Sequence, residues 1–248
     1  MKYLLTIVVC FLIFVCSDHT DTPAVLPPAL MKILSHHGTH SRWDKMEALS
    51  FQVKKNDGKE THFIDLKSRR GRIEGPTYKL GYDGKDIWVS ADSIYEGNPD
   101  MYHNLYFYLF AMPFVLSDDG IEYEQAPPIL FNGQQYPGLK ISFKKGIGNS
   151  PNDEYFLHYD PRTYRMAWLG HTFTYFEKEK SPHINWIRYD DWQWNNKILL
   201  PKSITCYNAI NGEITGPSNN ISFDSISINA YIPYQYNFEK PKRALVIK

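Results

Sequence analysis

The chain is poor in cysteine and has no excess of either charge. Its 248 residues include only three cysteines, Cys10, Cys16 and Cys206, and their spacing fits no metal-binding motif. Lysine and arginine together number 27, and aspartate and glutamate also number 27. Because no basic stripe stands out, the sequence argues against nucleic acid as a partner.

The motifs of common enzyme classes are missing as well. The sequence has no serine-centred nucleophile elbow, no phosphate-binding glycine loop and no H-E-x-x-H zinc motif. It therefore predicts a protein that is not an enzyme and that uses no cofactor and no metal. Aromatic residues, in contrast, are abundant at 15% of the chain. They suit strands, and they also suit apolar ligand pockets.

The N-terminal segment has the layout of an export signal. Lys2 precedes an apolar stretch over residues 3–15, which is shorter than the roughly 20 residues that a membrane-spanning helix needs. The stretch ends at a loose lipobox, Ile13-Phe14-Val15-Cys16, in which Cys16 would become the lipid-attachment residue. An ordinary cleavage after Ser17 fits the same segment, so both interpretations stay open.

The sequence therefore divides into three parts. We expect a signal peptide over residues 1–15, a flexible tether over residues 16–27 and a single folded domain over residues 28–248. The expected location is the periplasm or the outer membrane, with the lipid anchor holding the domain at the membrane.

The start of the domain predicts one short helix and then strands. Residues 28–37 have the apolar spacing of one helix face, with Gly38 suited to the helix end. From residue 48 onward, apolar and polar residues alternate as in half-buried strands. Asp57-Gly58 and Asp83-Gly84 supply the residues of tight hairpin turns, and Asp160-Pro161 marks a third hairpin.

The later strands predict a curved sheet. A one-residue shift in apolar phase between Phe223 and Ile226 indicates a β-bulge near Asp224-Ser225. The fold class is thus mostly β (α+β), with about nine to eleven strands in consecutive antiparallel order in a single strongly curved sheet.

Residues 101–116, MYHNLYFYLFAMPFVL, contain no Asp, Glu, Lys or Arg. A helix that is apolar all round is buried on most sides, and Pro113 predicts a kink or stop near Met112. We expect this helix inside the curve of the sheet. It is either a plug that completes the core, or a plug that also lines and gates a lipid-sized cavity.

Four segments carry a resemblance to known families. They are HHGTHSRW (residues 36–43), YHNLYFYLFAMPFVLSDDGIEYE (102–124), SPNDEYFLHYDP (150–161) and MAWLGHTFTYF (166–176). Together with the signal and tether, they resemble the LolA/LolB-like periplasmic lipoprotein carriers and, more closely, a Bacteroidetes envelope family of unknown function. The resemblance implies an unclosed β-barrel whose concave face is covered by helices and encloses an apolar cavity for acyl chains. No arginine of this chain matches the one that closes the carrier's lid.

Several polar clusters are candidates for chemistry. His36, His37 and His40 lie close together, but Gly38 interrupts the helix between them, so that hydrogen bonding at the helix end is the expected role rather than metal binding. The paired carboxylates Asp118-Asp119 and Asp190-Asp191 fit turn and strand chemistry. His171 and Cys206 fall on expected strands, as a hydrogen-bonded histidine and a buried inert thiol.

The aromatic residues are the stronger candidates for function. We expect a ligand cavity lined by strand residues and by the inner helix; its members are Trp88, Tyr106, Phe107, Phe110, Met112, Trp168 and Phe173. Two function classes follow. The first is an envelope lipoprotein that binds a lipid or acyl chain, with a possible part in lipid or lipoprotein trafficking. The second is a structural or interaction lipoprotein with a packed interior.

Overall fold

The computed structural model describes residues 26–92, 95–118, 120–144, 152–174, 181–210 and 212–247. The expected signal peptide, Cys16 and Asp119 lie outside these ranges. None of the helices in the described part has the length and apolar character needed to cross a bilayer.

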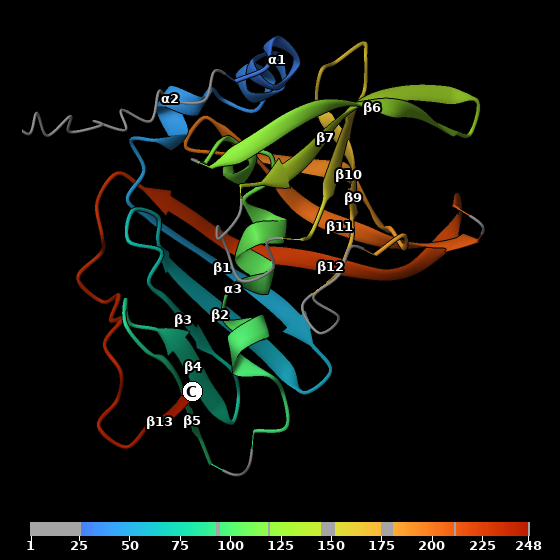
Figure 1. Ribbon diagram of the computed structural model, residues 1–248. Coiled ribbons are helices and arrows are strands. Elements are labelled where there is room, and N and C mark those ends of the chain that lie inside the picture. The colour runs from blue at the N-terminus through green and yellow to red at the C-terminus, as the bar shows by residue number, and fades with distance from the viewer. Residues whose placement is uncertain are drawn as a thin grey trace, which may run out of the picture.

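Within these ranges the chain forms three α-helices, one 3-10 helix and thirteen strands. Figure 1 shows their arrangement. The helices are α1 (Pro28–His36), α2 (His40–Trp43), α3 (Pro99–Phe110) and η1 (Phe114–Ser117). The strands are β1 (Ala48–Lys55), β2 (Gly58–Asp65), β3 (Gly71–Glu74), β4 (Tyr78–Tyr82), β5 (Ile87–Ala91), β6 (Ile121–Phe131), β7 (Gln134–Phe143), β8 (Tyr155–Tyr159), β9 (Met166–His171), β10 (Asn185–Asn195), β11 (Ile198–Ile210), β12 (Glu213–Asn229) and β13 (Leu245–Ile247).

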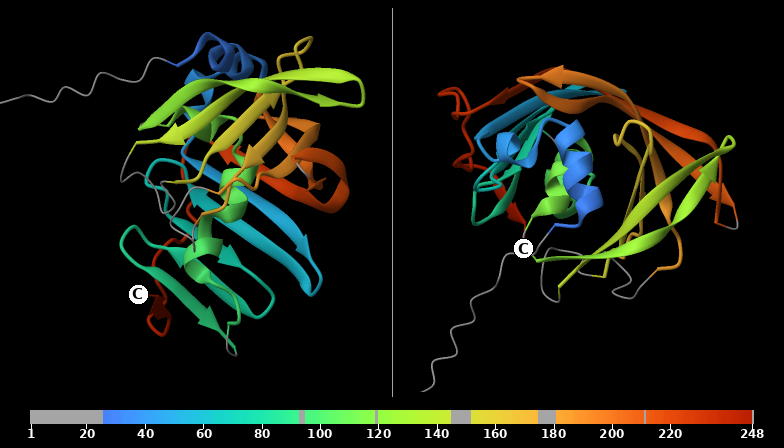
Figure 2. Two further views of the ribbon diagram at one scale, coloured as in Figure 1. Left: turned by 45° about the vertical axis from the view of Figure 1, so that its right-hand side comes forward. Right: turned by 90° about the horizontal axis from the view of Figure 1, so that it is seen from above.

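All thirteen strands join one antiparallel sheet in the order β13-β5-β4-β3-β2-β1-β12-β11-β10-β9-β8-β7-β6. The sheet curves round α1 and α3 without closing, since its two edge strands, β13 and β6, do not pair (Figure 2). The structure confirms the predicted fold class: a mostly β, strongly curved antiparallel sheet with helices on its concave face. The described part has thirteen strands rather than the predicted nine to eleven. The consecutive order holds within β1–β5 and within β6–β12, but it was wrong for the sheet as a whole, because β12 pairs with β1 and β13 pairs with β5.

The predicted local features are confirmed. The first helix ends at His36, and Gly38 adopts a positive φ of 111° just beyond it. Hairpins turn at the expected positions between β1 and β2, between β4 and β5, and between β8 and β9. The register of β12 against β1 shifts between Ser227 and Asp224, where the bulge was expected.

The main core fills the concave side of the sheet. α1 contributes Leu30, Ile33 and Leu34, and α3 with the turn after it contributes further buried apolar side chains. Two smaller clusters of buried residues lie elsewhere: one over β7, β9 and β10, and one over β3, β4 and β5. The helix α3 therefore fills part of the space on the concave side of the sheet.

Candidate functional site

The helix α3 has sharp ends. Asn98 caps its start by accepting a hydrogen bond from the Met101 N–H at 3.3 Å, and Pro99 stands in its first turn, where the missing N–H has no cost. The helix ends at Phe110, and Pro113 prevents its continuation. This agrees with the predicted stop near Met112.

The C-terminal half of α3 is held by apolar packing. The Phe110 ring is fully buried, with its centroid 4.4 Å from that of Phe51 and 4.8 Å from that of Phe223. The buried Tyr189 hydroxyl of β10 donates a hydrogen bond to the Leu109 carbonyl at 2.8 Å. This half of the helix is part of the main core.

The N-terminal half of α3 is held instead by a polar network. The Tyr102 hydroxyl donates to both carboxylate oxygens of Glu60, at 2.7 and 2.9 Å, and Glu60 is only 2% exposed. The Lys55 ammonium donates to the hydroxyls of Tyr102 and Tyr106 at 3.0 and 3.1 Å. Tyr78 also donates to Glu60. Two helix residues are thus tied to strands β1, β2 and β4 through hydrogen bonds.

The network fixes the ionisation of its members. Burial alone raises the pKa of Glu60, but hydrogen bonds from His62, Tyr78 and Tyr102 outweigh this effect and lower the pKa below its usual value. Burial lowers the pKa of His62, which lies 3.3 Å from Glu60. At neutral pH the network therefore contains the Glu60 carboxylate and a neutral His62 imidazole. The carboxylate charge is compensated within the network.

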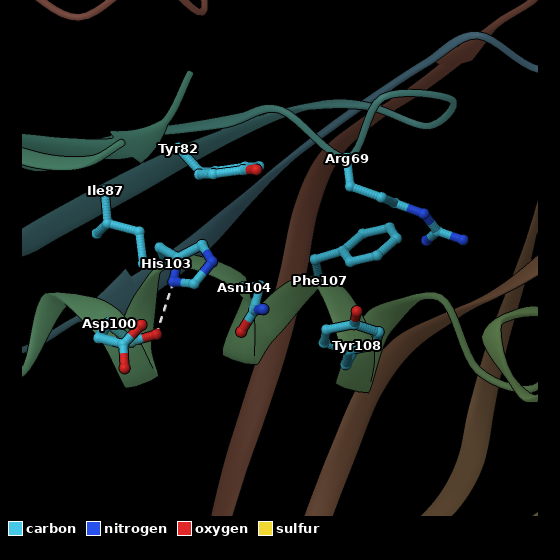
Figure 3. Close-up of a pocket in the computed structure, with 8 residues that line it drawn as sticks. All are labelled: Arg69, Tyr82, Ile87, Asp100, His103, Asn104, Phe107 and Tyr108. Carbon is cyan, nitrogen blue, oxygen red and sulfur yellow. Dashed lines mark hydrogen bonds between the residues drawn. The ribbon is translucent and has the colours of Figure 1, made fainter. Parts of the chain in front are cut away.

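A pocket of about 290 Å³ opens beside α3. It lies between the helix, the facing ends of β4 and β5, and the turn between β2 and β3 (Figure 3). Its lining residues are Arg69, Tyr82, Ile87, Asp100, His103, Asn104, Phe107 and Tyr108. Half of these residues are charged or polar (Arg69, Asp100, His103 and Asn104), and the other half are Ile87 and three aromatic residues.

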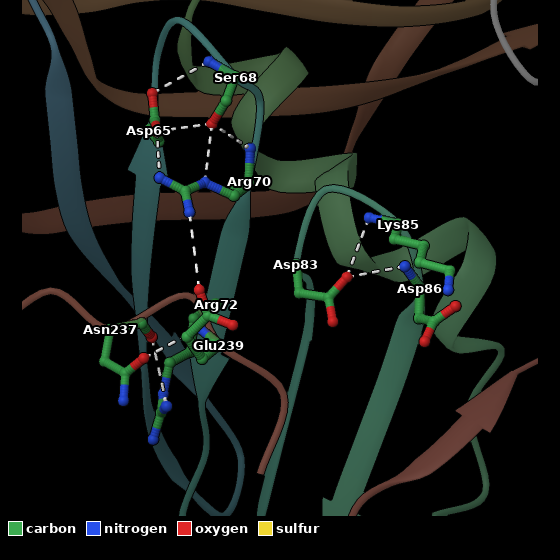
Figure 4. Close-up of polar contacts among 9 residues, drawn as sticks. All are labelled: Asp65, Ser68, Arg70, Arg72, Asp83, Lys85, Asp86, Asn237 and Glu239. Carbon is green, nitrogen blue, oxygen red and sulfur yellow. Dashed lines mark hydrogen bonds and ion pairs between the residues drawn. The ribbon is translucent and has the colours of Figure 1, made fainter.

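The turn between β2 and β3 positions Arg69 at one end of this pocket. Asp65 accepts hydrogen bonds from the backbone N–H groups of Lys67 and Ser68 at 3.0 Å and from the Arg70 guanidinium, also at 3.0 Å (Figure 4). The turn forces Arg69 to a positive φ of 60°. Its guanidinium contacts Asp118 at 2.7 Å and lies 5.1 Å from the centroid of the Phe107 ring.

His103 and Asn104 supply polar groups on the helix side of the pocket (Figure 3). The His103 Nδ1 donates to the Asp100 carbonyl at 2.6 Å, and burial lowers the pKa of the ring. In the neutral ring, Nε2 is then an acceptor. The Asn104 amide offers both a donor and an acceptor. The pocket can therefore hydrogen-bond a polar group of a ligand whose apolar part contacts Phe107 and Ile87.

The predicted cavity residues do not all surround one space. Four of them, Tyr106, Phe107, Phe110 and Met112, belong to or pack against the main core at α3. Trp88 pairs with Gly81 of the neighbouring strand β4. Its side chain lies on the face of the sheet away from α3. Trp168 packs in the second cluster, and Phe173 is 39% exposed. Only the helix residues remain candidates for a site on the concave face.

The other candidate groups have structural partners. The His36 Nδ1 donates to the Lys32 carbonyl at 2.9 Å, and His40 contacts Asp44 at 2.8 Å. Asp191 accepts from the Ser203 hydroxyl at 3.0 Å. Among the described residues, no three of His, Cys, Asp and Glu are grouped as a metal site would require.

Four further candidate groups from the sequence also lie beside identifiable partners or in partly buried positions. Asp118 pairs with Arg69, and Asp190 lies 3.4 Å from Arg188. His171 is the last residue of β9, and its Nδ1 lies 3.2 Å from the Thr172 carbonyl. Cys206 is half-buried rather than fully buried, and burial raises the pKa of its thiol. A raised pKa keeps the thiol protonated and weakly nucleophilic.

Sequence reasoning missed the polar network and the polar half of the pocket. A signal for the network does exist, because Glu60, His62 and Ile64 share the buried face of β2. Two polar residues in the apolar phase of a strand indicate a buried hydrogen-bonded cluster. Arg69 gives no such signal, because its position depends on the conformation of a turn.

Comparisons with known proteins found one family profile and several remotely similar solved structures. The sequence profile of a family of unknown function (DUF6503) matches residues 85–207, just under half of the chain. No curated protein matches. Similar solved structures include a LolA superfamily protein from Nitrosomonas europaea, with 9% identity and a TM-score of 0.46, covering 76% of this chain and 86% of that one.

Two further solved structures are similar to the same degree. A putative outer membrane lipoprotein-sorting protein domain from Vibrio parahaemolyticus has 9% identity and a TM-score of 0.41, with 83% of this chain and 95% of that chain covered. A DUF1329 family protein from Desulfovibrio piger has 12% identity and a TM-score of 0.46, with 84% and 97% covered. Structural neighbours thus include a LolA superfamily protein, but with such low sequence identities and TM-scores no function is inferred from them. A Bacteroidetes origin stays a prediction.

Proposed function

We propose that the protein is a non-enzymatic lipoprotein of the cell envelope that binds a lipid or an acylated ligand beside α3. The observation that carries this proposal is the pocket of about 290 Å³, whose wall combines Phe107 and Ile87 with the polar groups of His103 and Asn104. An amphiphile presents the same combination of an apolar chain and a polar head. In this proposal, Cys16 anchors the domain at the periplasmic side of a membrane, where such ligands occur.

The volume limits how the ligand is held. Ligand pockets usually span about 300–1,000 Å³, so this pocket accepts a short chain or one end of a longer one. Space for a complete lipid then requires α3 to move away from the sheet. The N-terminal half of α3 is suited to such movement, because its hydrogen bonds through Tyr102 and Tyr106 can exchange for water.

A specific observation also favours the second function class. Phe110 and its neighbours complete a continuous core, and no ligand has to be present for this packing. A structural or interaction lipoprotein with a packed interior would have this arrangement. The two proposals differ in whether the protein takes up an acyl probe.

Filling the pocket tests the proposal directly. In Asn104→Phe, an added ring occupies the pocket, and we expect the dissociation constant of a fluorescent fatty acid to rise roughly tenfold or more. Leu105→Phe is the matched control, because Leu105 is the next helix residue, lies outside the pocket lining and is partly exposed. It should leave the dissociation constant unchanged. If the wild-type protein takes up no acyl probe, the interaction function replaces the binding function.

A further inference from the structure

Two long hairpins, β6–β7 and β11–β12, project from the same side of the molecule (Figures 1 and 2). Each has an exposed aliphatic residue near its tip. Leu130 at the end of β6 is 68% exposed, and Ile210 at the end of β11 is 63% exposed. Gly133 and Gly212, one in the turn of each hairpin, have no atom within 4 Å of where a Cβ would stand. Both tips therefore extend into solvent.

The hairpin sequences contain almost no charge. Residues 125–139 include no Asp, Glu, Lys or Arg, and Glu213 is the single charged residue between positions 203 and 223. Charged residues make up 22% of the whole chain, so these two segments are distinctly neutral. Exposed segments that combine aliphatic side chains with so little charge are suited to contact with an apolar phase.

Aromatic residues lie directly behind the tips. The Phe131 ring centroid is 5.6 Å from that of Tyr207 and 4.7 Å from that of Trp168, so the two hairpins are in contact through these rings. Arg162, whose side chain is largely exposed, donates to the Gln134 side-chain oxygen at 3.3 Å. The order from the tips inward is aliphatic, then aromatic, with Arg162, which also pairs with Asp160 at 3.6 Å, beside the first hairpin.

We propose that the tips of the β6–β7 and β11–β12 hairpins dock on a lipid bilayer, with Leu130 and Ile210 entering the boundary between headgroups and acyl chains. A bilayer surface is arranged in the same order, since aliphatic side chains favour its interior, aromatic rings its interface and cations its phosphates. Pro127 and Pro128, both exposed on the edge strand β6, prevent a partner strand from pairing there. The surface thus fits a membrane better than an extended peptide.

Vesicle flotation tests this docking surface independently of the ligand pocket. The full-length exported protein carries Cys16→Ser, so that no acyl anchor contributes, and it is mixed with vesicles of phosphatidylethanolamine and phosphatidylglycerol. We expect the Leu130→Asp/Ile210→Asp variant to lower the partition coefficient by about tenfold or more, because two aliphatic contacts are replaced by carboxylates. Leu245→Asp is the matched control: Leu245, on the edge strand β13, is 69% exposed.

Three results decide the proposal. It is supported if the double variant loses binding, Leu245→Asp retains it, and Leu130→Trp, which keeps an interfacial side chain, also retains it. Equal losses in the double variant and in Leu245→Asp would overturn it, because the contact would not be localised to the tips. It is also overturned if the parent protein does not float with the vesicles. Circular dichroism of each variant separates loss of binding from loss of folding.

Discussion

The His37 imidazole joins the end of α1 to the sheet through both ring nitrogens: its Nε2 accepts from the Met166 backbone N–H at 3.0 Å, and its Nδ1 donates to the Leu199 carbonyl at 3.5 Å. The main chain strengthens this connection, since the Leu199 N–H donates to the His37 carbonyl at 2.8 Å. Burial lowers the pKa of His37 to about 3, so the ring is neutral in the folded protein. Of the histidines in the HHGTH segment, His37 is therefore the one with a structural role in the core.

This pKa predicts a specific pH dependence. Because the folded-state pKa lies below the unfolded value of about 6.5, the unfolded chain binds the proton first as the pH falls. The contribution of His37 to the free energy of unfolding is thus fully present above pH ~6.5 and is lost as the pH falls toward about 3. Urea denaturation at several pH values measures how the free energy of unfolding depends on pH. The wild type should show the loss of stability over this pH range, and His37→Gln should lack it.

At neutral pH, His37→Gln should lower the free energy of unfolding by about 1–3 kcal/mol, as expected when a buried hydrogen bond is left unsatisfied. His36→Gln is the control, because His36 is exposed and adjacent. Acyl binding by the folded fraction should not change. Equal effects of the two substitutions would contradict the role assigned to the His37–Met166 bond.

The network at Glu60 predicts how α3 moves. Tyr102→Phe removes the hydroxyl that donates to Glu60 at 2.7 Å, so the N-terminal half of α3 should open more often. We expect a destabilisation of about 1–3 kcal/mol, faster amide hydrogen exchange in α3 and faster uptake of an acyl probe. Tyr123→Phe is the control, because it removes a comparable tyrosine hydrogen bond, 2.7 Å to Leu116, outside the helix. Unchanged exchange in α3 after Tyr102→Phe would show that the network does not hold the helix.

Local sequence patterns predicted the helix before Gly38, the hairpin turns and the β12 bulge because each depends on a few adjacent residues. The sheet order could not be predicted in the same way. The pairing of Ala48 in β1 with Asn229 in β12 brings together residues from opposite ends of the domain, and no local pattern encodes it. The same applies to Val246 in β13, which pairs with Trp88 in β5.

The candidate site was predicted only in part. Alternation of apolar and polar residues shows which side chains share a face of a strand, but it does not show which face packs against a helix. Here both faces are covered. On the far face of β2, the Phe63 ring packs 4.9 Å from Tyr236, and the nearby Phe238 is buried as well. Trp88 is buried on the face away from α3, with the Arg72 guanidinium 5.8 Å from the centroid of its ring, and its apolar character alone could not place it there.

The lipid anchor remains a prediction from the sequence. Because the apolar stretch over residues 3–15 ends at Cys16, we expect the mature protein to begin at an acylated Cys16. Cys16→Ala should then move the protein from the membrane fraction to the soluble fraction, as measured by fractionation and immunoblotting. Mass spectrometry that finds an unmodified N-terminus at Asp18 in the wild type would instead support cleavage after Ser17.

Phe107 and Phe110 distinguish a plug from a gate within one helix. Phe110 is enclosed by Phe51 and Phe223, so Phe110→Ala should cost about 3–5 kcal/mol, as in a tight core. Phe107 is also buried, but part of its ring lines the pocket. Its replacement by Ala should cost less, because the new space joins an existing one.

The binding measurements should show the reverse order. Phe107→Ala enlarges the pocket and removes its apolar wall. The affinity for a fluorescent fatty acid should therefore change more in Phe107→Ala than in the folded fraction of Phe110→Ala. Thermal or chemical denaturation and probe titration of both variants check this pattern. A full core-sized destabilisation at both positions, with no uptake of any acyl probe by the wild type, would mean that α3 is only a plug.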